Sequence, residues 1–156
     1  MSDQDTAVLK VIVFQLKDEE YGVPVNQVRS IEKIQHITRV PRTDSFVKGV
    51  INLRGVVTPL IDLRSRFGLS ETDYTDSTRM IIVTLEDMEV GLIVDAANDV
   101  IDISNSAIEP PPEVVGAIQA AYINGVAKID KRLLILLNLD KVLRMKKINH
   151  TKPIEG

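Results

Sequence analysis

A segment of this chain occurs twice, and this repeat constrains the fold more than any single motif does. Phe46–Leu63 aligns without a gap with Tyr122–Leu139 at a constant shift of 76 positions. An earlier pair behaves in the same way, because Val11–Ile31 lies over Met80–Val100 at a shift of 69. The difference between the two shifts indicates an insertion in the second copy, around Pro110–Pro112. The sequence therefore predicts two related β units in one chain.

The repeated segment has the pattern of a β-hairpin. In the first copy, two apolar runs, Val47–Leu53 and Val56–Leu63, meet at Arg54–Gly55, where glycine gives the backbone the freedom that a tight reversal needs. The second copy places Ala120–Ile129 and Arg132–Leu139 in the same arrangement. We expect the two hairpins to superimpose, with the turn arginine projecting from the first. An exposed turn arginine without any function is the alternative, because such residues are commonly just solvated.

The segments outside these hairpins predict further strands and one short helix. Val8–Leu16 is apolar enough for a buried strand, and a charged turn leads to a return strand that closes at Pro24. In Val25–Lys33, apolar residues recur three positions apart after a capping asparagine, which predicts a short helix with one apolar stripe. Ile34–Val40 predicts a weak strand. Leu69–Ser77 is polar and turn-rich, so it is the expected boundary between the two lobes.

The composition excludes several classes of protein. The chain has 156 residues, of which 44% are hydrophobic, so it can bury a core. No apolar run approaches the roughly 18 residues that span a membrane, and the N-terminus lacks the pattern of a signal peptide. We therefore expect a soluble protein that is not exported. Without cysteine there are no disulfides, thiolate metal sites or cysteine nucleophiles, and the net charge of -3 argues against a nucleic-acid surface.

No motif for chemistry is present in the sequence. The glycines form neither a P-loop nor a dinucleotide fingerprint, and the two histidines, His36 and His150, lie outside any metalloprotease pattern. Paired carboxylates such as Glu19 and Glu20 fall in a hairpin turn, where a solvated face is the simpler interpretation. We therefore expect no enzymatic activity, no cofactor and no metal. The competing hypothesis is a small hydrolase or ligand-binding barrel, which would need an enclosed cavity lined by converging polar groups.

The segment Val47–Arg64 resembles the signature of CheW-type chemotaxis coupling proteins. Glu19–Gly22, Val28–Ile31 and Arg132–Leu136 extend the resemblance, as do Val94-Asp95 and Asp99-Val100, so that it covers residues 8–146. It implies an all-β fold with short helices, built from two intertwined five-stranded SH3-like barrels. On this basis the first barrel is expected at about 17–70, the second at 8–16 with 79–139, and flexible termini at 1–7 and 147–156.

The same resemblance implies a non-enzymatic adaptor in bacterial chemotaxis. Such a protein couples the cytoplasmic tips of transmembrane, methyl-accepting chemoreceptors to the regulatory domain of the histidine autokinase, in arrays beneath the inner face of the cell membrane. It is expected to be cytoplasmic, monomeric in isolation, and to bind neither nucleic acid nor the membrane interior. Two neighbours share this domain: the kinase's regulatory domain, whose phosphotransfer and ATP-binding segments are absent here, and the CheV type, for whose receiver domain the chain has no room.

The family pattern places receptor contact near the groove between the lobes. Carried over residue by residue, the expected protein-binding residues are Val28, Ile31, Gly49, Asn52, Leu53 and Arg54. Which of them face the receptor and which the kinase is left open. Ser30 departs from the acidic residue that is common at that position in the family, so no charge contact is expected there.

Overall fold

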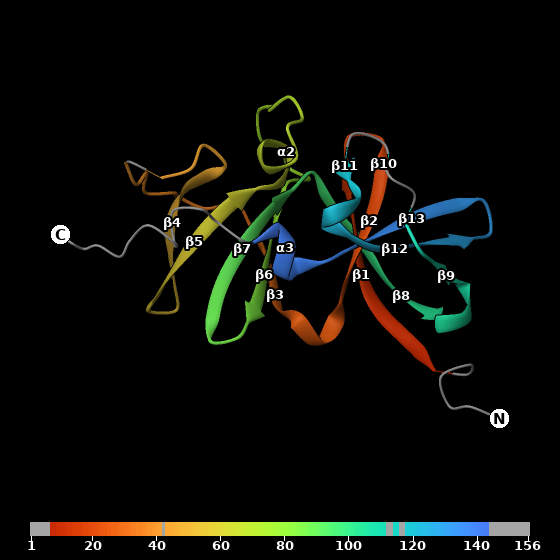
Figure 1. Ribbon diagram of the computed structural model, residues 1–156. Coiled ribbons are helices and arrows are strands. Elements are labelled where there is room, and N and C mark those ends of the chain that lie inside the picture. Colours follow the sequence, from red (N-terminus) through yellow and green to blue (C-terminus); the bar gives the residue numbers. More distant parts are fainter. Residues whose placement is uncertain (1–6, 42, 112–113, 116–117, 144–156) are drawn as a thin grey trace, which may run out of the picture.

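The computed structural model describes residues 7–41, 43–111, 114–115 and 118–143 and contains two β-sheets with only short helices. The predicted flexible termini fall almost wholly outside these residues and stay a prediction. In Figure 1 one sheet lies on the left and the other on the right. The five-stranded sheet has the order β3-β6-β7-β5-β4, and the six-stranded sheet has the order β8-β1-β2-β13-β12-β9. The predicted mainly-β fold with two separate units is confirmed.

The first barrel consists of β3 (Val28–Lys33), β4 (Val47–Leu53), β5 (Val56–Asp62), β6 (Arg79–Leu85) and β7 (Met88–Val94). The second consists of β1 (Val8–Leu16), β2 (Glu19–Pro24), β8 (Ala96–Ser104), β9 (Ile108–Glu109), β12 (Ile123–Ile129) and β13 (Arg132–Leu137). A further short pair is formed by β10 (Val114–Val115) and β11 (Ile118–Gln119). The helical turns are η1 (Val25–Gln27), α2 (Leu63–Arg66), η2 (Asn105–Ala107), η3 (Ala120–Tyr122) and α3 (Leu139–Val142).

The two repeats exchange their first hairpins, so the strands divide between the sheets differently from the predicted lobe ranges. Hairpin β1–β2 of the first repeat pairs with β8 and β13 of the second. Hairpin β6–β7 of the second repeat pairs with β3 and β5 of the first. Residues 17–24 therefore belong to the second barrel and residues 79–94 to the first. The apolar pattern identifies each strand but not its partner across the sheet, which is why the ranges differ.

The registers repeat along with the sequence. The parallel pairing of Leu60 with Gly91 in the first barrel recurs as Leu136 with Gly22 in the second. Each hairpin turn of the four long hairpins begins with a non-glycine residue at positive φ, between 53° and 56°: Lys17, Arg54, Glu86 and Asp130. Positive φ in the turn matches the right-handed twist of the paired strands. The predicted superposition of the central hairpins is supported by the same turn backbone at Arg54 and Asp130.

The predicted helix over Val25–Lys33 is wrong, because only η1 is helical and the remainder is strand β3. A β-bulge explains the misleading spacing. Val28 pairs with Val83 and Ile31 with Ile81, and the register shifts between Val28 and Ser30. The extra residue returns Val28 and Ile31 to one face of the sheet, so that a bulged strand imitates the stripe of a helix.

The predicted strand over Ile34–Val40 is also wrong, since only Thr38 forms an isolated bridge, to Val50. Ile34 and Ile37 instead pack against the interior of the first barrel. In the second barrel the equivalent bridge is the short strand β9, which pairs with Val126. Five strands were expected in that barrel, but six are present among the described residues. In β9 two residues, Ile108 and Glu109, are paired, whereas in the first barrel only Thr38 is.

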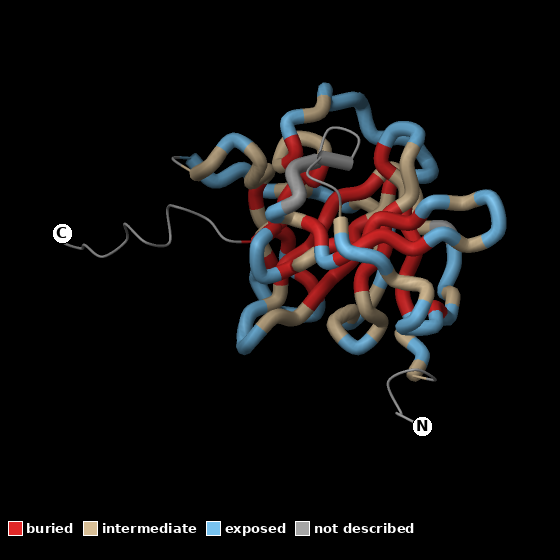
Figure 2. The backbone as a smooth tube through the Cα atoms, turned by 45° about the vertical axis from the view of Figure 1, so that its right-hand side comes forward, coloured by how far each residue is buried: buried red, intermediate tan, exposed pale blue. Residues whose placement is uncertain are grey.

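Three apolar clusters hold the fold together. One fills the first barrel, with Leu60, Met80 and Ile82 among its buried members. Another fills the second barrel. The largest lies between the sheets and contains residues of both, including Phe14 and Tyr21 from the second barrel and Ile61 and Leu92 from the first. Figure 2 shows the buried residues running through the middle of the molecule and the turns exposed at its edges. The two barrels therefore share a core.

Candidate functional site

The predicted binding residues come from β3 and from the β4–β5 hairpin of the first barrel. On β3, Val28 is half-buried and packs against the central core, whereas Ile31 is 41% exposed. Both lie on the sheet face that is directed toward the second barrel, as their pairing with core residues Val83 and Ile81 requires. Ile31 is therefore available at the rim of the contact between the barrels.

Gly49 and Leu53 have structural roles. Gly49 is buried at φ 145°, and a Cβ atom there would lie 2.2 Å from the Thr38 carbonyl oxygen, so the close backbone approach requires glycine. Leu53 is only 9% exposed and packs inside the first barrel. Asn52 is exposed, and its Oδ1 atom accepts a hydrogen bond of 2.9 Å from the Gly55 amide, which supports the turn.

Arg54 projects from this turn, as the sequence predicts. Its side chain is 69% exposed, and one Nη2–H donates to Glu32 Oε2 at 3.0 Å. The acidic partner of Arg54 is thus Glu32 of β3, and Asp62 is used elsewhere. The Ser30 hydroxyl and the Arg54 guanidinium lower the pKa of Glu32, so this carboxylate stays ionised. The ion pair links the hairpin turn to the edge strand β3.

An exposed apolar surface next to Arg54 is absent from the sequence prediction. Val56 and Val57 are 47% and 66% exposed, although the apolar run 56–63 predicts a buried strand. Met88, at the start of the neighbouring strand β7, is also exposed, by 40%. Further along β5, Thr58 is buried, and so are Leu60–Asp62. We call Arg54, Val56, Val57 and Met88 the hairpin patch.

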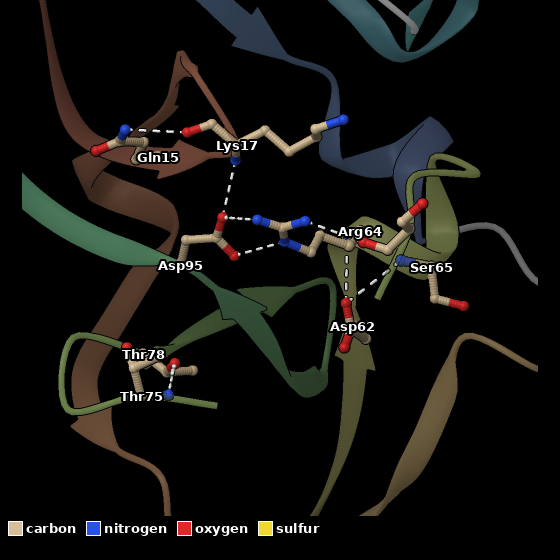
Figure 3. Close-up of polar contacts among 9 residues, drawn as sticks. Gln15, Lys17, Asp62, Arg64, Ser65, Thr75, Thr78 and Asp95 are labelled. Carbon is tan, nitrogen blue, oxygen red and sulfur yellow. Dashed lines mark hydrogen bonds and ion pairs between the residues drawn. The ribbon is translucent and has the colours of Figure 1, made fainter. Parts of the chain in front are cut away.

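A polar cluster at the other end of β5, where α2 begins, joins the two repeats (Figure 3). Arg64 of α2 donates through Nε to Asp95 Oδ1 at 2.8 Å and through Nη2 to Asp95 Oδ2. Asp95 Oδ2 also accepts a 2.8 Å hydrogen bond from the Lys17 amide. Burial opposes ionisation of Asp95, but Arg64 and the Lys17 amide outweigh it and lower the pKa of this carboxyl. The cluster fixes helix α2 to the β1–β2 turn.

Asp62 occupies the N-cap of α2 and is 3% exposed. Its Oδ1 atom accepts from the amides of Arg64 and Ser65 at 2.9 and 3.3 Å, and Oδ2 accepts from the Tyr74 hydroxyl at 3.4 Å. Burial raises the pKa of Asp62 against the opposing effect of the amide hydrogen bonds. This carboxylate therefore has a structural role in capping the helix.

The arrangement offers surfaces for contact. Within the described parts of the chain, no three His, Cys, Asp or Glu side chains are grouped so that they could hold a metal ion. A cavity of about 620 Å³ lies beside the loop Arg39–Ser45, and its lining includes the Lys48–Glu71 ion pair but no histidine. No described helix is long and apolar enough to cross a membrane.

Comparisons with known proteins agree with this architecture. The family model of the CheW-like domain matches residues 10–147. The chain belongs to the CheW-like family. It is 50% identical over 134 residues to the chemotaxis protein CheW of Bacillus subtilis (strain 168), with 86% of each chain covered. It is 34% identical over 139 residues to the chemotaxis protein CheW of Klebsiella aerogenes, with 89% of this chain and 84% of the relative covered.

A solved structure extends the agreement to three dimensions. The scaffolding protein TtCheW from Thermoanaerobacter tengcongensis superimposes with a TM-score of 0.80 and is 40% identical, with 85% of this chain and 90% of the other covered. The resemblance to CheW-type proteins and the SH3-like double barrel are therefore confirmed. This protein is a chemotaxis scaffold or adaptor of the CheW family.

Proposed function

We propose that this chain is a non-enzymatic adaptor that couples the cytoplasmic tips of chemoreceptors to the regulatory domain of the histidine autokinase. Residues 8–146 act as one two-lobed unit, cytoplasmic and monomeric in isolation, that joins arrays beneath the membrane through its partners. The observation that carries the proposal is the hairpin patch, in which an arginine lies beside exposed valines on a rigid turn. Such a combination fits a protein partner better than a small substrate.

Arg54 is the residue best placed to anchor a partner. A guanidinium has five N–H donors, and the described contact with Glu32 uses one of them. The remaining donors can bind a carboxylate or backbone carbonyls of the partner, while Glu32 restricts the side chain and reduces the entropy lost on binding. Val56 and Val57 would exclude water around that contact. An arginine in such surroundings is a typical interface hot spot.

The other proposed binding residues divide into two groups. Ile31 and Asn52 are exposed and would contact a partner directly. Val28, Gly49 and Leu53 would act indirectly, because the half-buried valine supports β3 and the other two shape the hairpin. Substitutions in the second group should therefore change stability and binding together.

Arg54→Ala tests the assignment. The side chain is exposed, so the free energy of unfolding should change by no more than about 0.5 kcal/mol. Binding to a receptor cytoplasmic fragment or to the kinase regulatory domain should weaken at least tenfold, which is about 1.4 kcal/mol. Melting temperature and affinity for both partners, measured on the same purified variant by calorimetry, separate these effects.

Lys10→Ala is the matched control, because Lys10 is also an exposed cation in an ion pair, with Asp102 of the second barrel at 2.8 Å. It should leave both affinities unchanged. Normal binding of the Arg54→Ala variant to both partners would remove the patch from the site. An unmodified chain that binds neither partner would refute the adaptor function itself.

A further inference from the structure

The boundary between the two repeats differs from the boundary between the two barrels. The ladders β1·β8, β2·β13, β3·β6 and β5·β7 each join a strand of residues 7–66 to a strand of residues 79–143. The ring of Phe67, which directly follows α2, likewise stacks on Tyr21 of the first repeat and contacts Tyr122 of the second in a tilted arrangement. Neither repeat alone contains a complete barrel among the described strands.

One connection, residues 67–78, joins the repeats. Phe67 and Thr78 at its two ends are buried, whereas residues 70–77 between them are all exposed. Its side-chain contacts to the body of the protein go mainly to the first repeat: Glu71 accepts from Lys48 at 2.7 Å, Tyr74 donates to Asp62, and the Ser70 carbonyl accepts from Arg64 at 2.9 Å. The segment can therefore stay attached to the first repeat while the chain leaves it in another direction.

The distance that this connection must span is short compared with its length. β5 and β7 are parallel, and the first residue of β6, Arg79, pairs with the last residue of β7, Val94. From the end of β5 to the start of β6 the chain thus passes one strand, about 10 Å at two strand spacings, whereas the twelve residues of the connection can extend to roughly 40 Å. Its extra length permits closure within one chain and leaves room for an open arrangement.

We propose that residues 70–77 form a hinge and that the two repeats are complementary halves, so that a second copy of this chain can supply the missing half. In the exchanged form each double barrel contains residues 7–69 of one copy and 78–143 of the other. Every ladder and core contact is kept, and only the path of the hinge changes. Exchange of this kind has a low thermodynamic cost, while the closed monomer is favoured by the high effective concentration of linked halves.

Separately expressed halves test the complementarity. Residues 1–71 and 72–156 should each show an unfolded far-UV circular dichroism spectrum and poor amide dispersion in NMR. Mixed in equal amounts, they should form one folded complex with the mass of the intact chain and a cooperative melting transition. A stable barrel from either half alone would overturn the proposal, and so would a mixture that stays unfolded.

Two full-length variants test the exchange between copies. Gly49→Val disables the first repeat and Gly125→Val the second, since a Cβ atom would lie 2.2 Å from the Thr38 carbonyl oxygen and 2.8 Å from the Glu109 carbonyl oxygen. Refolded together, the intact repeats of the two variants should combine into a dimer with one double barrel that melts near the wild-type temperature. A mixture that melts as the sum of the two separate variants would refute exchange. If the variants precipitate, the result from the separate halves decides.

Discussion

The β4–β5 turn of the first barrel and the β12–β13 turn of the second begin with the same backbone conformation but with residues of opposite charge. Arg54 and Asp130 occupy equivalent positions, with φ angles of 53° and 55°. In the first barrel Arg54 pairs with Glu32 of β3, whereas Ile101 stands at the position of Glu32 in the second and packs on the core of that barrel. The duplication thus preserved the positive φ at the start of the turn, while the turn residues and the surfaces diverged.

The neighbouring strand positions differ in the same way. Val56 and Val57 of β5 correspond to Arg132 and Leu133 of β13. Arg132 makes a bidentate contact with Glu20, at 2.9 and 3.1 Å, and Leu133 is 46% exposed. In the first barrel both positions are exposed valines. This difference favours the first barrel as the place of the proposed binding site.

The largest expected loss of stability is at Gly49, and it should exceed the loss at the equivalent Gly125. Gly49→Ala should lower the free energy of unfolding by about 3 kcal/mol or more, because the new Cβ would collide with the Thr38 backbone at a φ of 145°. Gly125→Ala meets Glu109 at 2.8 Å without a positive φ, so its cost should be smaller. Urea unfolding of both variants measures the difference. Equal losses would show that the backbone approach at Gly49 and Thr38 is as restrictive as the approach at Gly125 and Glu109.

The sequence predicts the hairpins well because they are local. Runs of apolar residues define β4, β5, β12 and β13 without knowledge of any distant contact, and Gly55 marks the turn of the first hairpin. The exchange of hairpins, the bulge in β3 and the Arg54–Glu32 pair all depend on residues far apart in the chain. These features are properties of the assembled sheets and have no local signal.

The next largest expected loss of stability concerns Arg66, which contacts residues of both repeats. The Arg66 guanidinium lies 4.6 Å from the ring centroid of Phe46 and 4.9 Å from that of Tyr122, which are equivalent aromatic residues. It also donates to the Val142 carbonyl at 2.7 Å, and Val142 is the counterpart of Arg66 in the second copy. Arg66→Met should therefore cost about 2 kcal/mol of stability, since two cation–π contacts and a charged hydrogen bond are lost.

Thermal and urea unfolding measure this cost, and Arg29→Met provides the control. Arg29 is 65% exposed and pairs with Glu89 at 3.3 Å, so its replacement should change stability by less than about 0.5 kcal/mol. A similarly small change for Arg66→Met would mean that the contacts of Arg66 add little to the β-ladders and the shared core that join the two copies.

The two helix caps predict a smaller, pH-dependent effect. Asp62 caps α2 and Asn138 caps α3 at equivalent positions. Burial raises the pKa of Asp62 in the folded state, so the folded protein binds this proton more tightly than the unfolded chain does. Stability contributed by the protonated form is present at low pH and is lost as the pH rises through the folded pKa. Asp62→Asn keeps a capping oxygen and removes this titration.

The stability of the Asp62→Asn variant, relative to wild type, should therefore increase with pH and then level off above the folded pKa. Urea unfolding across a pH series from mildly acidic to neutral measures the difference. Asn138→Ala, which removes a cap that does not titrate, should lower stability by about 1 kcal/mol at every pH. A relative stability of the Asp62→Asn variant that decreases with pH would reverse the assigned sign of the shift.

At Glu32 the expected change in stability is small, and the comparison between the barrels becomes a test of binding. Glu32→Gln removes the charge that Arg54 faces, but the pair is largely exposed on the arginine side, so unfolding should change by less than about 1 kcal/mol. If Glu32 positions Arg54 for a partner, affinity should fall by a few fold in this variant and by no more in the double variant than in Arg54→Ala alone. Binding to both partners across this double-mutant cycle measures the coupling. Independent, additive losses would instead mean that Glu32 contacts the partner itself. Arg54 and Glu32 would then bind the partner through two separate contacts.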